Sequence, residues 1–253
     1  MSSLRGRSPS ASRKRKSLGS RLRPFSALIV VAVIGVALGG YYGAKWPGFR
    51  PRHIVVTGAT VVSRAEVLQR AAIDPNRNVW LQNAGAAAAR VASIPYVSTV
   101  QIRRRLPAQI TIAIQERKPF AIVTDGSMRV LVDDQLQILG VDPLQTDLPL
   151  LRGEIENSTV GKRLNTAALA QLARDCKALL RASVPVAYLN LDRLGNLNAR
   201  LTSGVLVEFG DDSNVAEKAR LVNPVLSQVP QSGRKVRALD LRSVKTPVVV
   251  FAH

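Results

Sequence analysis

The sequence has few of the residues on which most enzyme sites depend. Its 253 residues include one cysteine, Cys176, and two histidines, His53 and His253. A single cysteine excludes an intramolecular disulfide, and no ligand spacing exists for a Cys/His metal site. A Ser-His-Asp triad would have to use one of the two histidines, and no Gly-x-Ser-x-Gly motif is present. The sequence therefore predicts a protein that is not an enzyme and holds no metal or cofactor.

Other chemical signals are also scarce. Aromatic residues make up 4% of the chain, and no glycine-rich phosphate loop of the Walker or Rossmann type occurs. Asp133-Asp134 and Asp211-Asp212 are adjacent carboxylates in turn-like polar stretches, which predicts solvated turn residues rather than an acid/base pair. Cys176 follows Leu169 and Leu172 at helical spacing. This pattern favours buried packing over a reactive thiol.

Acidic residues are absent from residues 1–23, which hold eight of the 36 basic residues of a chain with a net charge of +19. This serine- and arginine-rich segment is predicted to be a disordered tail. A basic balance attracts polyanions such as nucleic acid, anionic lipid headgroups or acidic wall polymers. For the tail we favour a topology signal that touches anionic lipid, and we expect no nucleic-acid binding.

The 21 residues 24–44 carry no charge. As a helix rising ~1.5 Å per residue they would reach roughly 31 Å, about the thickness of a hydrocarbon core. Tyr41, Tyr42 and Trp46 follow at the far end, where interfacial aromatics gather. We predict a single transmembrane helix contacting membrane lipid, with residues 1–23 cytoplasmic and 45–253 outside. A cleaved signal peptide is the alternative, but the run is long and Gly43-Ala44 is a weak cleavage site.

Residues 51–119 are predicted to form a small α+β unit of order β-α-α-β-β. Residues 53–57 have the pattern of a short strand, and Ser63 opens a helix with a capping-box pattern. Residues 84–92 are an alanine-rich second helix. Residues 97–104 and 109–116 then alternate in polarity as paired strands, connected by a turn at residues 105–108.

Residues 120–253 are predicted to form a β-rich domain with a mostly antiparallel sheet. Strands are expected at 129–132 and 135–139, at 197–201 and 205–209 around a hairpin turn, and at 236–241 and 248–251. Asn165 is expected to cap a helix containing Leu169 and Cys176, and a second helix is expected over about 215–221.

The run from Val100 to Ala121, VQIRRRLPAQITIAIQERKPFA, resembles the signature of the FtsQ/DivIB family of bacterial cell-division proteins. In that signature an Arg-x-aromatic-Pro hairpin leads into an alternating strand that ends in Glu-Arg-x-Pro-x-Ala. The β-α-α-β-β order is similar to a POTRA domain. Residues 148–153 and 240–242 resemble the family's Leu-Pro-x-Leu-x-Gly and Asp-Leu-Arg segments. Leu106 and Ser243 stand where the family has an aromatic residue.

The resemblance implies a non-catalytic scaffold of the divisome in the inner membrane at the division septum. Its expected partners are the FtsB- and FtsL-type bitopic proteins, and it links early division proteins to septal wall synthesis without a small-molecule substrate. Two alternatives remain open. A POTRA-bearing component of secretion or outer-membrane assembly would need a β-barrel for which about 130 residues leave little room, and a wall-polymer-binding module is the other.

Two sites are predicted from the residues. The apolar run Val248, Val249, Val250 and Phe251 is a candidate edge strand that a partner completes, with Asp240 and Arg242 fixing its register or meeting the partner's charges. A last strand that merely seals the core is the alternative. Arg103, Arg104 and Arg105 are either a solvated face or a contact for an anionic wall polymer, lipid headgroup or acidic surface.

Overall fold

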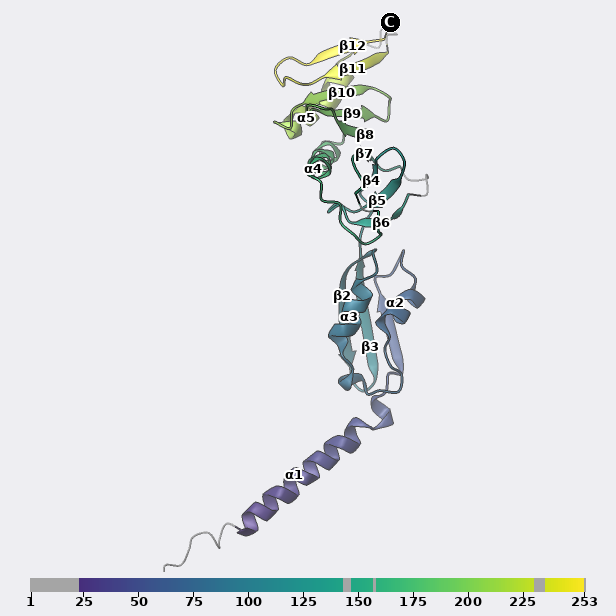
Figure 1. Cartoon of the computed structure of the whole chain (residues 1–253), viewed down its shortest axis with the longest axis vertical. Helices are drawn as coiled ribbons and strands as arrows, with labels where there is room; N and C mark the ends of the chain where they lie inside the picture. The colour runs from purple at the N-terminus through teal and green to yellow at the C-terminus, as the bar shows by residue number, and fades with distance from the viewer. Residues whose placement is uncertain (1–22, 143–146, 157, 230–234, 253) are drawn as a thin grey trace, which may run out of the picture.

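A computed structural model describes residues 23–142, 147–156, 158–229 and 235–252. Figure 1 shows a long helix, then a small three-stranded unit, then a larger sheet that carries the C-terminal strands far from the helix. This arrangement confirms the α+β class and the order of a POTRA-like unit followed by a β-rich one. Residues 1–22 of the predicted tail lie outside the described residues.

Helix α1, Arg23–Ala44, coincides with the uncharged segment, and a short 3-10 turn, η2, Pro47–Phe49, follows it. The described apolar side chains of α1 are exposed along its length, including Leu28, Val31 and Val36. In the part of the chain that the structure describes, no helix combines the length and apolarity needed to cross a membrane.

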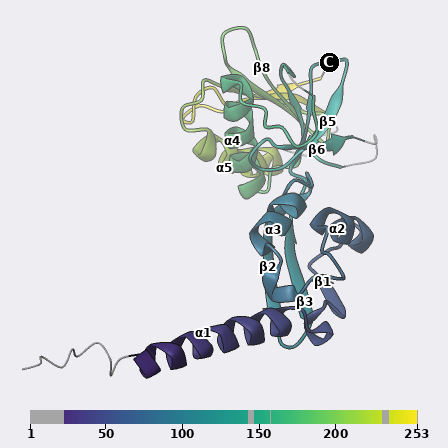
Figure 2. The ribbon, with the colours of Figure 1, turned by 60° about the horizontal axis from the view of Figure 1, so that its bottom comes forward.

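The small unit consists of β1, His53–Thr57, α2, Arg64–Ala71, η3, Val79–Leu81, α3, Ala84–Ala92, β2, Val97–Arg105, and β3, Gln109–Glu116. The sheet order is β1-β3-β2, with β1 parallel and β2 antiparallel to the central strand. Figure 2 shows α2 and α3 beside this sheet. The predicted β-α-α-β-β order is confirmed.

Local signals explain these elements. The hydroxyl of Ser63 accepts a hydrogen bond from the Glu66 N–H at the start of α2, as the capping pattern predicts. Along β3, Ile110, Ile112 and Ile114 are buried and the intervening side chains are more exposed, so the period-2 pattern sets the core face.

Nine strands form the sheet of the larger unit. They are β4, Ala121–Thr124, β5, Arg129–Val132, β6, Ile138–Val141, β7, Leu150–Arg152, β8, Val186–Leu191, β9, Leu197–Leu201, β10, Leu206–Gly210, β11, Val236–Asp240, and β12, Val248–Phe251. Their order is β12-β11-β10-β9-β8-β7-β4-β5-β6. The pairs β10–β11, β4–β7 and β7–β8 are parallel and the other five are antiparallel, which confirms the mostly antiparallel sheet.

Two helices, α4, Ala167–Arg181, and α5, Val215–Gln228, pack on this sheet. Their buried residues, such as Leu172 and Val222, join one core with Phe209 and Leu239 of the strands. A separate core, which contains Val67 and Ile112, holds the small unit together. Each unit therefore buries its own apolar side chains.

Several local expectations for the larger unit were wrong. The cap of α4 is Thr166, whose hydroxyl accepts from the Leu169 N–H, and not Asn165. The strand expected at 135–139 begins only at Ile138, because residues 133–136 form a turn closed by the Leu136 N–H on the Asp133 carbonyl. Helix α5 continues through Pro224 to Gln228 instead of ending near 221.

Candidate functional site

Strand β12 forms one edge of the nine-stranded sheet. It pairs on one side with β11, antiparallel, with Val248 opposite Asp240 and Val250 opposite Ala238. No strand of the described residues pairs with its other side. Figure 1 places β12 at the end of the chain farthest from α1. The structure therefore confirms that residues 248–251 form an edge strand.

The backbone of β12 presents polar groups to this open side. The Ala252 N–H donates to the Lys235 carbonyl at 2.9 Å, so it points toward β11. Successive residues of an antiparallel strand alternate between pointing inward and outward. Counting back along β12, Val250 points its N–H and C=O toward β11, whereas Val249 points its own toward the open side. An extended segment lying beside β12 would find these groups ready to pair.

The side chains of β12 divide between the two faces of the sheet. Val248 and Val250 are 53% and 43% exposed on one face. Val249 lies on the other face and packs against the core that contains Leu239. The strand is therefore held to the domain by Val249, while its exposed valines offer apolar surface to a neighbour.

Asp240 and Arg242 form a pair with each other. The guanidinium of Arg242 donates to both carboxylate oxygens of Asp240, at 3.0 and 2.6 Å, and lies 4.0 Å from Glu208. The hydrogen bond from Arg242 lowers the pKa of Asp240. Gly210, with φ of +74°, leaves room for this guanidinium arm, because an added Cβ would lie 3.1 Å from its Cγ. The two charges therefore neutralise each other, and contact of this pair with a partner's charges stays a prediction.

The arginine triplet is split by the strand. All three residues belong to β2, and Arg104 donates to the Trp80 and Gln82 carbonyls at 3.3 and 2.7 Å. Arg103 and Arg105 are exposed on the opposite face, where Arg103 donates to Gln101. Arg104 therefore has a structural role, and the other two remain available to an anion.

The carboxylates predicted to be solvated turn residues differ from one another. Asp133 is 3% exposed, and this part of the prediction was wrong. Its carboxylate accepts from the Gln135 and Gln137 N–H groups at 2.9 and 2.8 Å and pairs with Arg117 at 2.8 Å. A turn that closes a β-hairpin above a core can bury its own carboxylate when that group satisfies the turn's N–H groups. Asp134 is exposed, as predicted, and lies 3.2 Å from Lys177.

Asp211 and Asp212 are exposed, as predicted. Asp211 nevertheless has a partner, since its carboxylate lies 3.2 Å from the buried ammonium of Lys218. That ammonium also donates to the Phe209 carbonyl at 2.8 Å.

Cys176 is buried, and burial raises the pKa of its thiol to about 12, so it packs as an apolar residue as predicted. Across the described stretches, no cluster of three or more histidine, cysteine or acidic side chains is arranged to hold a metal.

Sequence reasoning missed the role of Glu116. Its carboxylate accepts hydrogen bonds from the Thr60, Val61 and Val62 N–H groups, at 2.8–3.0 Å, and from the Thr60 hydroxyl. Burial raises the pKa of Glu116, but these bonds outweigh it and lower the pKa to about 2. The end of β3 is thereby tied to the loop that leads into α2. The glutamate of the Glu-Arg-x-Pro segment was the signal, but sequence spacing does not reveal a partner 54 to 56 residues away.

Comparison with known proteins gives two family matches in chain order. Residues 49–117 match the POTRA domain, FtsQ-type. Residues 121–242 match the family described as cell division protein FtsQ/DivIB, C-terminal. The two matches cover the small unit and most of the large sheet, and β12 follows the last matched residue. Both are FtsQ-type, so they do not favour the secretion or outer-membrane alternative.

Whole-chain relatives agree with these matches. The chain is 26% identical to cell division protein FtsQ of Streptomyces venezuelae over 228 residues, 85% of this chain and 83% of that one. It is 27% identical to FtsQ of Anaeromyxobacter sp. over 249 residues, 95% and 84% of the two chains. The solved extracytoplasmic domain of DivIB from Geobacillus stearothermophilus aligns with 46% of this chain and 90% of that one, at 17% identity and a TM-score of 0.27.

Proposed function

The chain belongs to the FtsQ/DivIB family of bacterial cell-division proteins, and we propose that it is a non-catalytic, membrane-anchored scaffold that binds a partner by strand addition at β12. The observation that carries the proposal is the open edge of the large sheet. Val249 directs its backbone N–H and C=O away from β11, and Val248 and Val250 are exposed on either side of it. An unpaired apolar edge strand is an aggregation liability unless another chain covers it.

The proposed partners are the FtsB- and FtsL-type bitopic division proteins. An extended segment of such a protein would add a strand next to β12, so that main-chain hydrogen bonds supply affinity and the side chains near Val248 and Val250 supply selectivity. Asp240 lies opposite Val248 on the preceding strand, and its ion pair with Arg242 supports the proposal that these two residues fix the register of β12. We expect neither nucleic acid nor a small-molecule substrate.

We place the protein in the inner membrane at the septum, with residues 24–44 as the anchor. Support comes from the 21 uncharged residues and from the eight basic residues that precede them, with no acidic ones. The apolar side chains of α1 described from Leu28 onward are exposed to their surroundings, as those of a lipid-facing helix would be. The basic tail then stays in the cytoplasm and both folded units lie outside.

The absence of catalysis is part of the proposal. The buried carboxylate Asp133 is engaged in a turn and an ion pair, and the acidic groups Asp211 and Asp240 are each paired with a cation. Each of these groups therefore has a structural partner in place of a substrate. Such a protein acts by bringing other proteins together.

Photo-crosslinking in cells tests this function. A photoreactive amino acid replaces Val250 in the full-length chain, and a second variant carries it at Arg200, an exposed position on the interior strand β9. We expect a covalent adduct with a bitopic division protein from position 250 and none from position 200. No adduct from position 250, or equally strong adducts from both positions, would refute strand addition at β12.

A further inference from the structure

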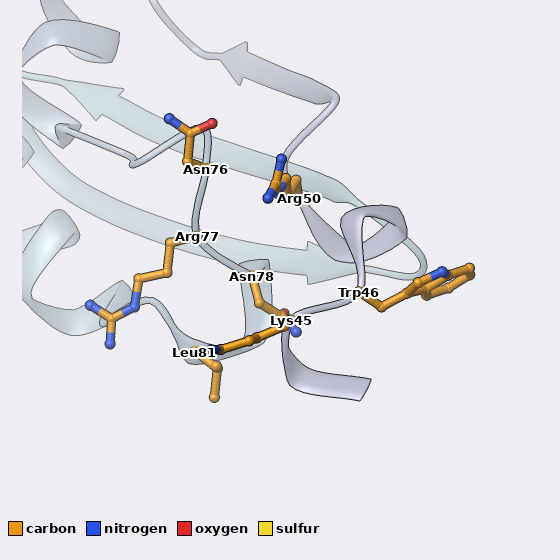
Figure 3. Close-up of a pocket in the computed structure, with 7 residues that line it drawn as sticks. All are labelled: Lys45, Trp46, Arg50, Asn76, Arg77, Asn78 and Leu81. Carbon is orange, nitrogen blue, oxygen red and sulfur yellow. The ribbon is translucent and has the colours of Figure 1, made fainter. Parts of the chain in front are cut away.

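A second feature lies at the opposite end of the folded part, where α1 meets the small unit. A cavity of about 330 Å³ opens between the residues that follow α1 and the loop that contains η3 (Figure 3). Lys45, Trp46 and Arg50 line it from one side, and Arg77 and Leu81 line it from the other, with two asparagines between them. The volume is within the range of roughly 300–1,000 Å³ that is typical of ligand sites.

The lining is cationic and has no carboxylate. Lys45, Arg50 and Arg77 are all exposed. Within the described residues, the guanidinium groups of Arg50 and Arg77 form no hydrogen bond or ion pair. The ammonium of Lys45 hydrogen-bonds the Tyr41 hydroxyl and lies 4.2 Å from the centre of that ring. Three positive charges therefore surround one cavity without an anion to neutralise them.

Apolar side chains lie at the same end of the unit. The Arg52 N–H donates to the Ala108 carbonyl, which brings the β2–β3 turn next to the start of β1, and Arg104 ties η3 to β2. As a result, Trp46, Trp80 and Leu106, which are 57%, 43% and 72% exposed, accompany the cations. Tryptophan, leucine and basic side chains together are typical of the membrane–water interface.

The charge of the whole unit points the same way. Residues 45–119 contain 12 basic and three acidic residues, whereas residues 120–253 contain 16 basic and 14 acidic ones. None of the three acidic residues, Glu66, Asp74 and Glu116, lines the cavity. The positive field of the exported part is therefore concentrated in the unit next to the anchor.

We propose that this cavity binds the phosphate headgroup of an anionic phospholipid. The lipid belongs to the outer leaflet, on the side where the C-terminal end of α1 leaves the membrane. The inference rests on the proposed anchor, because residues 24–44 would hold Lys45 and Trp46 at the headgroup level. The phosphate lies between Lys45, Arg50 and Arg77, while Trp46, Leu81 and Leu106 contact the acyl boundary. A free phosphate or a wall polymer would satisfy the cations but would leave these apolar side chains in water.

The chain offers a direct probe, because Trp46 and Trp80 are its two tryptophans and both lie at this end. The full-length protein is reconstituted into nanodiscs of phosphatidylcholine that contain a small fraction of either brominated phosphatidylglycerol or brominated phosphatidylcholine. Bromine quenches a nearby indole. At equal lipid content, we expect brominated phosphatidylglycerol to quench the tryptophan fluorescence more strongly than brominated phosphatidylcholine. The stronger quenching would report local enrichment of the anionic lipid around the protein.

Matched variants locate the effect. Arg50→Gln with Arg77→Gln removes two lining cations, and we expect the preference for the anionic lipid to fall about fivefold for each charge removed. Arg193→Gln with Arg220→Gln removes the same charge from exposed positions of the large sheet unit and should leave the preference unchanged. Both double variants should bind division partners as the parent does. A negative result for lipid binding at the cavity can then be told apart from a negative result for partner binding at β12.

Competition experiments distinguish a lipid phosphate from free phosphate and from a soluble polyanion. Inorganic phosphate or soluble dextran sulfate, added in excess, should not abolish the preferential quenching. Equal quenching by the two brominated lipids, a preference that survives in the Arg50→Gln, Arg77→Gln variant, or complete displacement by inorganic phosphate would each overturn the assignment. Displacement by dextran sulfate alone would identify a polyanion as the ligand, and failure of the chain to enter nanodiscs would overturn the anchor and this inference together.

Discussion

The two sheets of the molecule differ in charge and in what their exposed parts offer. The small sheet, β1-β3-β2, belongs to a strongly basic unit whose free cations gather where α1 ends. The large sheet belongs to a unit with nearly balanced charge, and its exposed feature is the apolar strand β12 at the far end. This difference underlies our proposals that one unit contacts an anionic surface and that the other binds a protein segment through its backbone.

The two units also have separate cores, joined by a short polar link. Arg117 follows β3, and its N–H donates to the Tyr96 carbonyl of the small unit at 2.7 Å. Its guanidinium pairs with Asp133 of the large unit. The comparison can therefore be tested by perturbing one core, then the link, then a contact within the small unit.

The largest effect is expected in the core of the large unit. Phe209→Ala removes a fully buried ring and should lower the free energy of unfolding of that unit by about 3–5 kcal/mol. Hydrogen exchange of the full chain should then accelerate in β8–β11 and stay slow in β2 and β3. Ile112→Ala, in the other core, should give the reverse pattern. Acceleration in both sheets from either variant would show that the units unfold together.

Loss of the link between the units is expected to lower the free energy of unfolding almost as much. Asp133→Ala leaves Arg117 without its carboxylate partner and two turn N–H groups without an acceptor, which should cost about 3 kcal/mol in thermal or denaturant unfolding. Asp134→Ala, at the exposed neighbouring position, should cost less than about 0.5 kcal/mol. A loss from Asp133→Ala as small as that from Asp134→Ala would mean that neither the ion pair nor the turn hydrogen bonds of Asp133 stabilise the protein.

The smallest effect is expected at Glu116. Glu116→Gln should destabilise the small unit by about 1 kcal/mol at neutral pH, a modest value because solvent reaches the carboxylate. The pKa of Glu116 is lowered from 4.5 to about 2 in the folded state. Its contribution is therefore complete above pH 4.5 and is lost as the pH falls toward 2. The stability difference between Glu116→Gln and the parent should shrink over that window, and a constant difference would assign it to packing.

Residues that act within one element could be predicted from the sequence. The alternating isoleucines of β3, the serine cap of α2 and the edge position of Val248–Phe251 all depend on local pattern and chain order. Strands β4, β7 and β8 were missed. Ala121–Thr124 is short and mostly buried in the middle of the sheet, so it lacks the alternation that marks a half-exposed strand, and Leu150–Arg152 has too few residues to show a pattern.

The candidate sites divide in the same way. Asp240 and Arg242 lie two residues apart, and their proximity could be inferred, although their pairing with each other could not. The buried state of Asp133 and the contacts of Glu116 and Arg104 depend on partners 16 to 56 residues away. No local pattern encodes such distances. The cavity at Lys45, Arg50 and Arg77 likewise exists only once η3 is folded against the end of α1.

The central claim, strand addition at β12, is tested most directly by proline at Val249. Its N–H points away from β11, so Val249→Pro removes a donor from the open edge without removing one from the sheet. With the full-length chain and purified FtsB- and FtsL-type partners, we predict binding at least about tenfold weaker, a loss of roughly 1.4 kcal/mol, with unchanged circular dichroism and melting.

Two controls accompany this measurement. Val249→Ala keeps the N–H and should retain binding within about threefold. Val250→Pro removes an N–H directed at β11 and should loosen β12 from the sheet itself. A folded Val249→Pro variant that binds its partners with undiminished affinity would contradict the account, as would unfolding of the domain by that substitution.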